Sequence, residues 1–209
     1  MREEMNEARM LRDLAALNRR FLAIASRGVS GPAPVGAEVI SALEPAAMAR
    51  LAGLPFTLFS FGFGADRCWE VLCARGVRDA EGAGPEPDRA RERFVLLGLA
   101  FLRQAVVQDA RRAAVFAGVP RPIGTWLAEL EFGDLVALAP TAAACLRWRF
   151  PAQARFWGEL MRACRTPDEA LLPVLRAAGV QWTIRRALAL EEEACRRKAG
   201  FRVPGAGGR

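Results

Sequence analysis

Residues 144–150, ACLRWRF, and residues 57–63, TLFSFGF, are the two stretches of this sequence that alternate as β-strands do. Each places large apolar side chains two residues apart, and each follows a segment with Leu-Ala and a proline. A lone short strand leaves an unpaired backbone edge, so we expect the two segments to pair antiparallel with each other. The seam between them would be formed by Phe59, Phe61, Phe63, Leu146, Trp148 and Phe150.

Helical periodicity predicts a mostly α fold around these two strands. The segment 76–89, GVRDAEGAGPEPDR, is rich in glycine, proline and charge and indicates a linker. The last ten residues, 200–209, indicate a tail. The expected helices span residues 3–26, 36–43, 45–53, 66–75, 89–117, 121–130, 132–139, 151–164, 167–178 and 181–199.

The two strands belong to halves that match each other at an offset of 87 residues. Leu43 corresponds to Leu130 without a gap, and each half begins with a helix, LNRRFLAIASR and FVLLGLAFLRQ. The second half has about ten more residues between that helix and Leu130. An internal duplication would divide the chain into unit 1 (1–75, shortened), a linker (76–89), unit 2 (90–164), C-terminal helices (165–199) and a tail (200–209).

The repeated segments resemble the FlhD family of bacterial flagellar transcriptional activators. The resemblance lies in VVQDARRAAVFAGV, WLAEL, LVALA and CLRWRF in the second half, and in LNRRFLAIASR, LEPAAMARLAG and LFSFGF in the first. It includes the family-motif positions Asp109 and Gly118, and the first half lacks the segment that joins them. FlhD modules are helical, dimerise, and act with a zinc-containing partner, FlhC, at promoters. The resemblance implies two tandem FlhD-like units that form an intramolecular pseudo-dimer, with their strands paired at a pseudo-dyad.

The charge of the chain favours anionic partners. The formal net charge is +7 and the isoelectric point is about 10.3, with Lys198 the only lysine. Residues 111–130, RRAAVFAGVPRPIGTWLAEL, have the rhythm of a helix-turn-helix, and an αα-corner that only builds the core remains the alternative. Arg147 and Arg149 lie on the opposite strand face from the seam. The candidate DNA-binding residues are Arg111, Arg112, Arg121, Arg147 and Arg149.

Several functional classes are disfavoured by what the sequence lacks. There is no histidine, which excludes Ser-His and Cys-His catalysis, and none of the five cysteines forms a C-x-x-C pair. We therefore expect no enzyme activity, cofactor, metal or small-molecule substrate. The acidic N-terminus and a longest apolar run of about nine residues, at 94–102, indicate a cytoplasmic protein without a membrane span.

Two functions agree with these observations. The first is a transcriptional regulator that resembles a fused FlhD dimer and acts through an FlhC-like or other regulatory protein in flagellar, motility or secretion gene control. This regulator could also contact phosphates of duplex DNA. The alternative is an adaptor or anti-activator that mimics the FlhD dimer and sequesters its partner without binding DNA.

Overall fold

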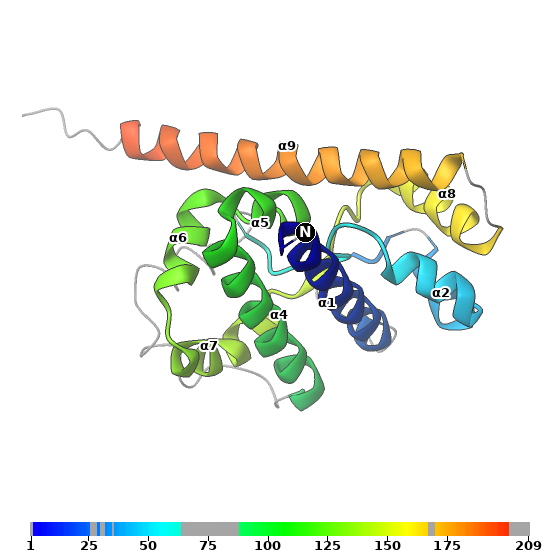
Figure 1. The fold of residues 1–209 in the computed structure, drawn as a ribbon, viewed down its shortest axis with the longest axis horizontal. Helices are drawn as coiled ribbons and strands as arrows, with labels where there is room; N and C mark the ends of the chain where they lie inside the picture. Colours follow the sequence, from blue (N-terminus) through cyan, green and yellow to red (C-terminus); the bar gives the residue numbers. More distant parts are fainter. Residues whose placement is uncertain are drawn as a thin grey trace, which may run out of the picture.

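The computed structural model describes residues 2–25, 29, 32–34, 36–63, 88–166 and 170–200. It is mostly helical with one small antiparallel sheet, as predicted (Figure 1). The expected helix 66–75, most of the linker 76–89 and nearly all of the tail 200–209 lie outside the described residues. The elements are α1 (Arg2–Ala25), the 3-10 helix η1 (Ala37–Ala42), α2 (Pro45–Ala52), β1 (Phe59–Ser60), α4 (Arg89–Gln108), α5 (Ala110–Ala117), α6 (Arg121–Glu129), α7 (Phe132–Ala144), β2 (Arg147–Trp148), α8 (Ala154–Arg165) and α9 (Leu171–Gly200).

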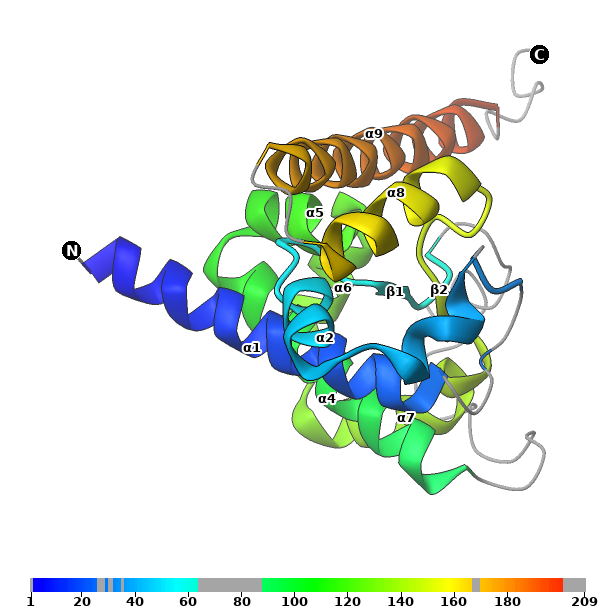
Figure 2. The same cartoon turned by 90° about the vertical axis from the view of Figure 1, so that its right-hand side faces the viewer.

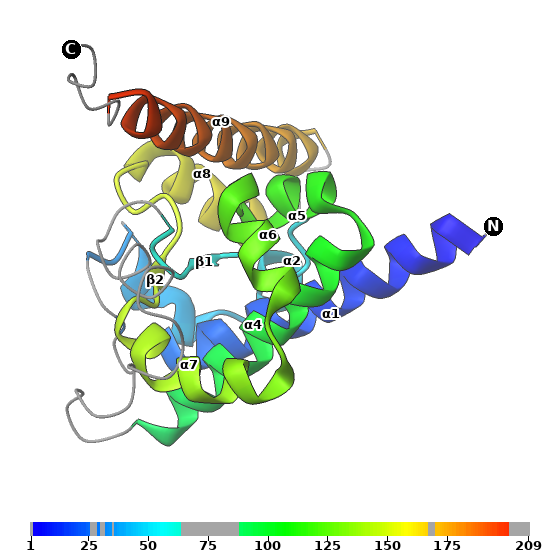
Figure 3. The ribbon, with the colours of Figure 1, turned by 90° about the vertical axis from the view of Figure 1, so that its left-hand side faces the viewer.

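The two predicted strand segments pair antiparallel, which confirms that expectation. Phe59 lies opposite Trp148, Ser60 lies opposite Arg147, and the amide of Arg149 donates to the carbonyl of Leu58 at 2.9 Å. Figures 2 and 3 show this ribbon between α8 and α9 on one side and α1, α4 and α7 on the other. Each strand has two residues in place of the expected seven.

The seam is buried, but its packing differs from the expected face-to-face contact. The ring of Phe21 on α1 lies 5.5 Å from Phe59 and 4.8 Å from Trp148, so that a third element joins the two strands. Phe150 is half-buried, and its ring contacts are to Phe56, Phe156 and Trp182. Phe150 has a φ of 54°, which turns the chain out of the ribbon and ends the ladder there.

A buried asparagine on α1 holds the segment that leads into β1. The amide nitrogen of Asn18 donates to the carbonyls of Ala52 (3.1 Å) and Phe56 (3.0 Å), and its oxygen accepts from the amide of Leu58 (2.9 Å). The Asn18 side chain is fully buried. These backbone groups are not paired with a strand. The Asn18 side chain therefore provides the hydrogen bonds that a longer β-ladder would otherwise provide.

The helix expected at 89–117 is two helices, because Asp109 interrupts it. Asp109 is extended, with φ −161° and ψ 101°, and its carboxylate accepts from the amides of Arg111 and Arg112 as an N-cap. At the other end of α5, Gly118 has a φ of 61° and forms a left-handed C-cap. The two family-motif residues therefore mark the two ends of α5.

The helices expected at 167–178 and 181–199 are one helix, α9, because Gly179 does not break it. Gly179 is buried, and a Cβ atom there would overlap the ring of Phe56. The glycine is used for close packing of α9 on the loop before β1 rather than for a turn. In the same way α7 runs past the expected end at 139 to Ala144, with Pro140 inside it.

We predict that Gly179→Ala destabilises the protein and that Gly158→Ala does not. The methyl group at 179 must displace Phe56 or α9, which should lower the free energy of unfolding by about 1–3 kcal/mol. Gly158 on α8 is exposed and has open space around its Cα, so alanine there should raise stability by about 0.4–1 kcal/mol. Urea denaturation measures both, and equal effects at the two positions would contradict the close contact.

We further predict that Asn18→Ala lowers the free energy of unfolding by about 3 kcal/mol, since three buried backbone groups lose their partner. Arg19→Ala, at the exposed neighbouring position, is the control and should change stability by less than about 0.5 kcal/mol. Thermal and urea unfolding report both values. An Asn18→Ala protein as stable as the wild type would show that the loop before β1 does not depend on this side chain.

Candidate functional site

Two grooves flank α9. The ribbon groove lies between the β-ribbon and α9, has a volume of about 620 Å³, and is lined by residues 147–153 and by Trp182, Arg185, Arg186 and Ala189 among others. The corner groove lies between α5, the start of α6 and α9, has a volume of about 510 Å³, and includes Leu188 and Glu191. Helical periodicity places these two sets on different sides of the buried face of α9.

The structure distributes the five candidate DNA-binding arginines over three places. Arg111 and Arg121 are exposed and line the corner groove. Arg147 and Arg149 line the ribbon groove. Arg112 lies at neither groove, and its guanidinium forms ion pairs with Glu7 of α1 (3.7 Å) and with Asp109 (3.4 Å). The five side chains therefore do not form one continuous basic surface.

Arg149 is buried, with 7% of its surface exposed, which corrects the expectation of an exposed strand arginine. Its Nε donates to the carbonyl of Phe59 at 3.2 Å, Nη1 donates to the hydroxyl of Thr183 at 3.4 Å, and Nη2 donates to the carbonyl of Ala117. One guanidinium thus joins β1, the C-terminal end of α5 and the middle of α9. Arg149 is a link between elements and is not presented at the surface to DNA.

The positive charge of Arg149 has no carboxylate partner among the residues that the structure describes. Its hydrogen bonds go to two carbonyls and one hydroxyl. Burial removes solvent from the cation and lowers the pKa of Arg149 from its ordinary value to about 9, so it remains charged at neutral pH. A buried cation without a counter-charge lies at the wall of the ribbon groove.

The α5–α6 corner turns at Gly118 and packs its inner side into the core. Gly124 and Leu127 of α6 are buried, with Gly124 against Val106 and Val119. At the amino end of α6, the amide of Arg121 donates to a carboxylate oxygen of Glu191 on α9 at 2.8 Å. A DNA phosphate approaching this helix end would meet that negative charge, which occupies the position an anion would take.

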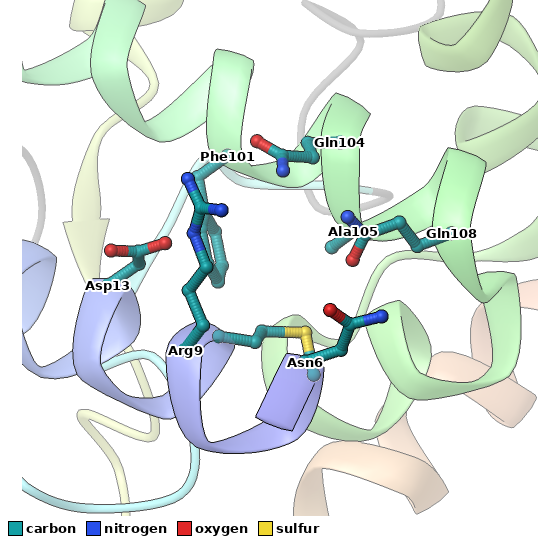
Figure 4. Close-up of a pocket in the computed structure, with 8 residues that line it drawn as sticks. Asn6, Arg9, Asp13, Phe101, Gln104, Ala105 and Gln108 are labelled. Carbon is teal, nitrogen blue, oxygen red and sulfur yellow. The ribbon is translucent and has the colours of Figure 1, made fainter. Parts of the chain in front are cut away.

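A third cleft, between α1 and α4, is too small for a ligand. Figure 4 shows Asn6, Arg9 and Asp13 of α1 facing Phe101, Gln104 and Gln108 of α4. Its volume of about 50 Å³ has room for a few water molecules.

In the described part of the chain, no group of three or more His, Cys, Asp or Glu side chains could hold a metal ion. Cys145 and Cys164 are buried and are not in disulfides, and burial raises the pKa of Cys164 to about 11. None of the helices in these ranges is both long and apolar enough to cross a bilayer.

No protein-family model, curated protein or solved structure matches this chain.

Sequence reasoning missed the contribution of α9 to the ribbon groove. Trp182, Arg185 and Arg186 of α9 line this groove together with β2. Helical spacing predicts that these three residues share one face of α9. No local sequence pattern indicates that this face lies against β2.

We predict that Arg149→Met destabilises the protein by about 2–4 kcal/mol, because the carbonyls of Phe59 and Ala117 remain buried without a donor. Arg147→Met is the matched control on the same strand; Arg147 is half-buried, and the change should cost less than about 1 kcal/mol. Urea unfolding separates the two. If both variants unfold at the same denaturant concentration, Arg149 does not link β1, α5 and α9.

Proposed function

We propose that this protein is a transcriptional regulator built as a single-chain counterpart of an FlhD dimer, and that it acts by binding a partner protein. The observation that carries the proposal is the register of the ribbon. Ser60 and Arg147, which correspond at the offset of 87 residues, lie opposite each other. They are also the central residues of the matched segments 57–63 and 144–150. An antiparallel pair centred on equivalent residues is what a two-fold relation between the halves requires.

The backbone before the strands supports the same relation. Leu43 ends η1 with φ −68° and ψ 137°, and Leu130 ends α6 with φ −69° and ψ 142°. The amide of Leu43 donates to the carbonyl of Ile40, and the amide of Leu130 donates to that of Leu127, three residues back in both cases. The same local conformation thus recurs at the same offset.

The helices that follow these leucines also begin alike. Glu44 is the N-cap of α2, with φ −60° and ψ 152°, and Glu131 is the N-cap of α7, with φ −82° and ψ 168°. The described residues between α1 and η1 (29, 32–34 and 36) form no helix that would correspond to α5, in agreement with the shortened first half. These correspondences favour two copies of one unit over a chance similarity of apolar spacing.

Exposed apolar side chains on α7 offer a surface for the partner protein. Phe132 is 68% exposed and Val136 is 46% exposed, and their spacing of four residues places them on one helix face. Large apolar groups that remain in solvent on one face are typical of protein–protein contacts. We expect Phe132→Ser with Val136→Ser to weaken partner binding without changing the unfolding midpoint.

Among the five candidate DNA-binding arginines, the exposed ones would make the contacts with promoter DNA. Arg111 and Arg121 lie together at the corner groove, and Arg147 is half-buried. Such side chains would neutralise phosphates and confer salt dependence without reading sequence.

The alternative function, an adaptor or anti-activator that sequesters the partner without binding DNA, is favoured by one contact. Glu191 places a carboxylate at the amino end of α6, where helix-turn-helix proteins begin their base contacts. In this alternative DNA does not bind at the corner groove, and the protein functions through the partner-binding surface on α7.

The test combines the purified chain with a purified FlhC protein. We expect a stable complex in analytical ultracentrifugation, with one copy of this chain filling the place of two FlhD chains, and binding of the complex to promoter duplex in fluorescence anisotropy. Arg111→Ala with Arg121→Ala should reduce the slope of log K against log salt by about 1–2. Arg19→Ala with Arg20→Ala, an exposed pair on α1, is the matched control and should leave the slope unchanged.

The possible outcomes separate the two functions. A complex that forms but has no affinity for duplex DNA at low salt supports the adaptor. Absence of a complex, together with unchanged motility and secretion transcripts after deletion of the gene, would overturn the proposed function.

A further inference from the structure

The ribbon groove has a chemistry that partner binding does not use. Its walls are largely aromatic and aliphatic, including Trp148, Trp182 and Leu190, and arginines 147, 185 and 186 surround them. None of the described residues that line the groove is acidic. Its volume of about 620 Å³ lies within the range of about 300–1,000 Å³ that small-molecule pockets occupy.

Arg149 provides a second, independent indication of an anionic ligand. The side chain is more than nine-tenths buried and lines the groove. A guanidinium has five N–H donors, and the hydrogen bonds to Phe59, Thr183 and Ala117 use three of them. Because the cation also lacks a carboxylate partner in the described structure, a ligand carboxylate would supply both the counter-charge and the remaining acceptors.

The backbone of the groove is held in an unusual conformation. Four described residues have positive φ, and three of them, Gly62, Gly118 and Phe150, line this groove. Phe150 is the one that is not glycine, and its carbonyl accepts from the indole of Trp157 at 3.1 Å. Glycine adopts a positive φ without strain, so the strained residue is Phe150. Backbone strain at a non-glycine residue is found at ligand sites, where the surrounding packing maintains it.

We propose that the ribbon groove binds a small apolar carboxylic acid. Its carboxylate would lie toward Arg149 and the arginines around the groove, and its apolar body would lie along Phe150, Trp182 and Ala189, which are only half-buried. This inference goes beyond the proposed function and does not rest on it, because neither the FlhC-like partner nor DNA is needed for the acid to bind.

A small acid fits this groove better than a peptide or a nucleic acid strand. The uncompensated cation is buried in the wall, so we expect a terminal carboxylate to reach it more readily than a group within a polymer chain. The aromatic side chains Trp148 and Phe63 are buried as well, with only part of their surface facing the groove, so they are not free stacking platforms for bases.

Binding would also affect the fold, because the groove is bounded by β2 on one side and α9 on the other. An acid that contacts both elements stabilises α9 in its docked position. The ligand would therefore raise the melting temperature of the whole chain and bias the position of the helix that carries Glu191.

The experiment is isothermal titration calorimetry of the full chain with dodecanoate and, as a neutral probe of equal length, dodecan-1-ol. We expect dodecanoate to bind with a Kd in the micromolar range and the alcohol to bind at least about tenfold more weakly. Arg185→Ala with Arg186→Ala should weaken dodecanoate at least about tenfold, and Ala189→Trp should block the groove. Arg111→Ala with Arg121→Ala, in the corner groove, is the matched control and should bind dodecanoate as the wild type does.

Four results would overturn the assignment: no dodecanoate binding up to about 1 mM, equal affinity for the alcohol, unchanged binding by the Ala189→Trp protein, or equal losses in the control pair. Tighter binding of an acidic Phe/Glu peptide or of oligo-dT, lost in the Arg185/Arg186 variant, would assign the groove to a macromolecule instead. Arg185 and Arg186 are exposed, so their variants should keep the wild-type melting temperature, which establishes that they are folded. None of these readouts involves the partner protein, so the groove and the proposed function can fail separately.

Discussion

The pairing of Phe59 and Ser60 with Trp148 and Arg147 is the contact on which the other elements depend. It joins segments 87 residues apart, and a two-stranded ribbon of this length is not stable by itself. Side chains from the helices complete it. Asn18 holds the approach to β1 from the side of α1, and Arg149 holds β1 to α5 and α9 from the other side. The aromatic ring of Phe21 packs against Phe59 of β1 and Trp148 of β2.

Arg149 connects the β-ribbon to the proposed ligand site, because it both holds the ribbon in place and lines the ribbon groove. Its cation is buried, which is unfavourable, and its hydrogen bonds to Phe59, Ala117 and Thr183 offset that cost only in part. The same residue lines the ribbon groove, and α9 connects that groove to Glu191 at the start of α6. A ligand in the ribbon groove and DNA at the corner groove would therefore both lie against α9.

The sequence predicted the features that follow from periodicity and missed those that follow from a single contact. The alternation of apolar and polar residues identified both strand segments. Each alone would have an unpaired backbone edge, so they are expected to pair with each other. The break at Asp109 was missed because the apolar pattern continues across it, although an aspartate before two arginine amides is a usual N-cap. Gly179 suggested a helix end, but its role is packing against Phe56.

For the candidate site, the positive charge could be predicted from the sequence, but the positions of the charged side chains could not. Arginines 111, 121 and 147 are exposed or half-buried, as strand-face and helix-face patterns suggest. The burial of Arg149 could not be deduced, because alternation places it on the polar face of β2, and that face is covered by α9 and by the carboxyl end of α5. The position of α9 depends on long-range packing that no local pattern records.

The central claim is that the two halves meet within one chain at the Phe59–Trp148 pair, and nuclear Overhauser spectroscopy tests it most directly. These two residues flank the hydrogen-bonded Leu58–Arg149 pair, so they form a non-hydrogen-bonded pair whose Hα protons lie close together. The account predicts a strong Hα–Hα cross-peak between Phe59 and Trp148 that is absent from an isotope-filtered spectrum of mixed labelled and unlabelled chains. Absence of the cross-peak, or its appearance in the filtered spectrum as a contact between two molecules, would contradict the single-chain pseudo-dimer.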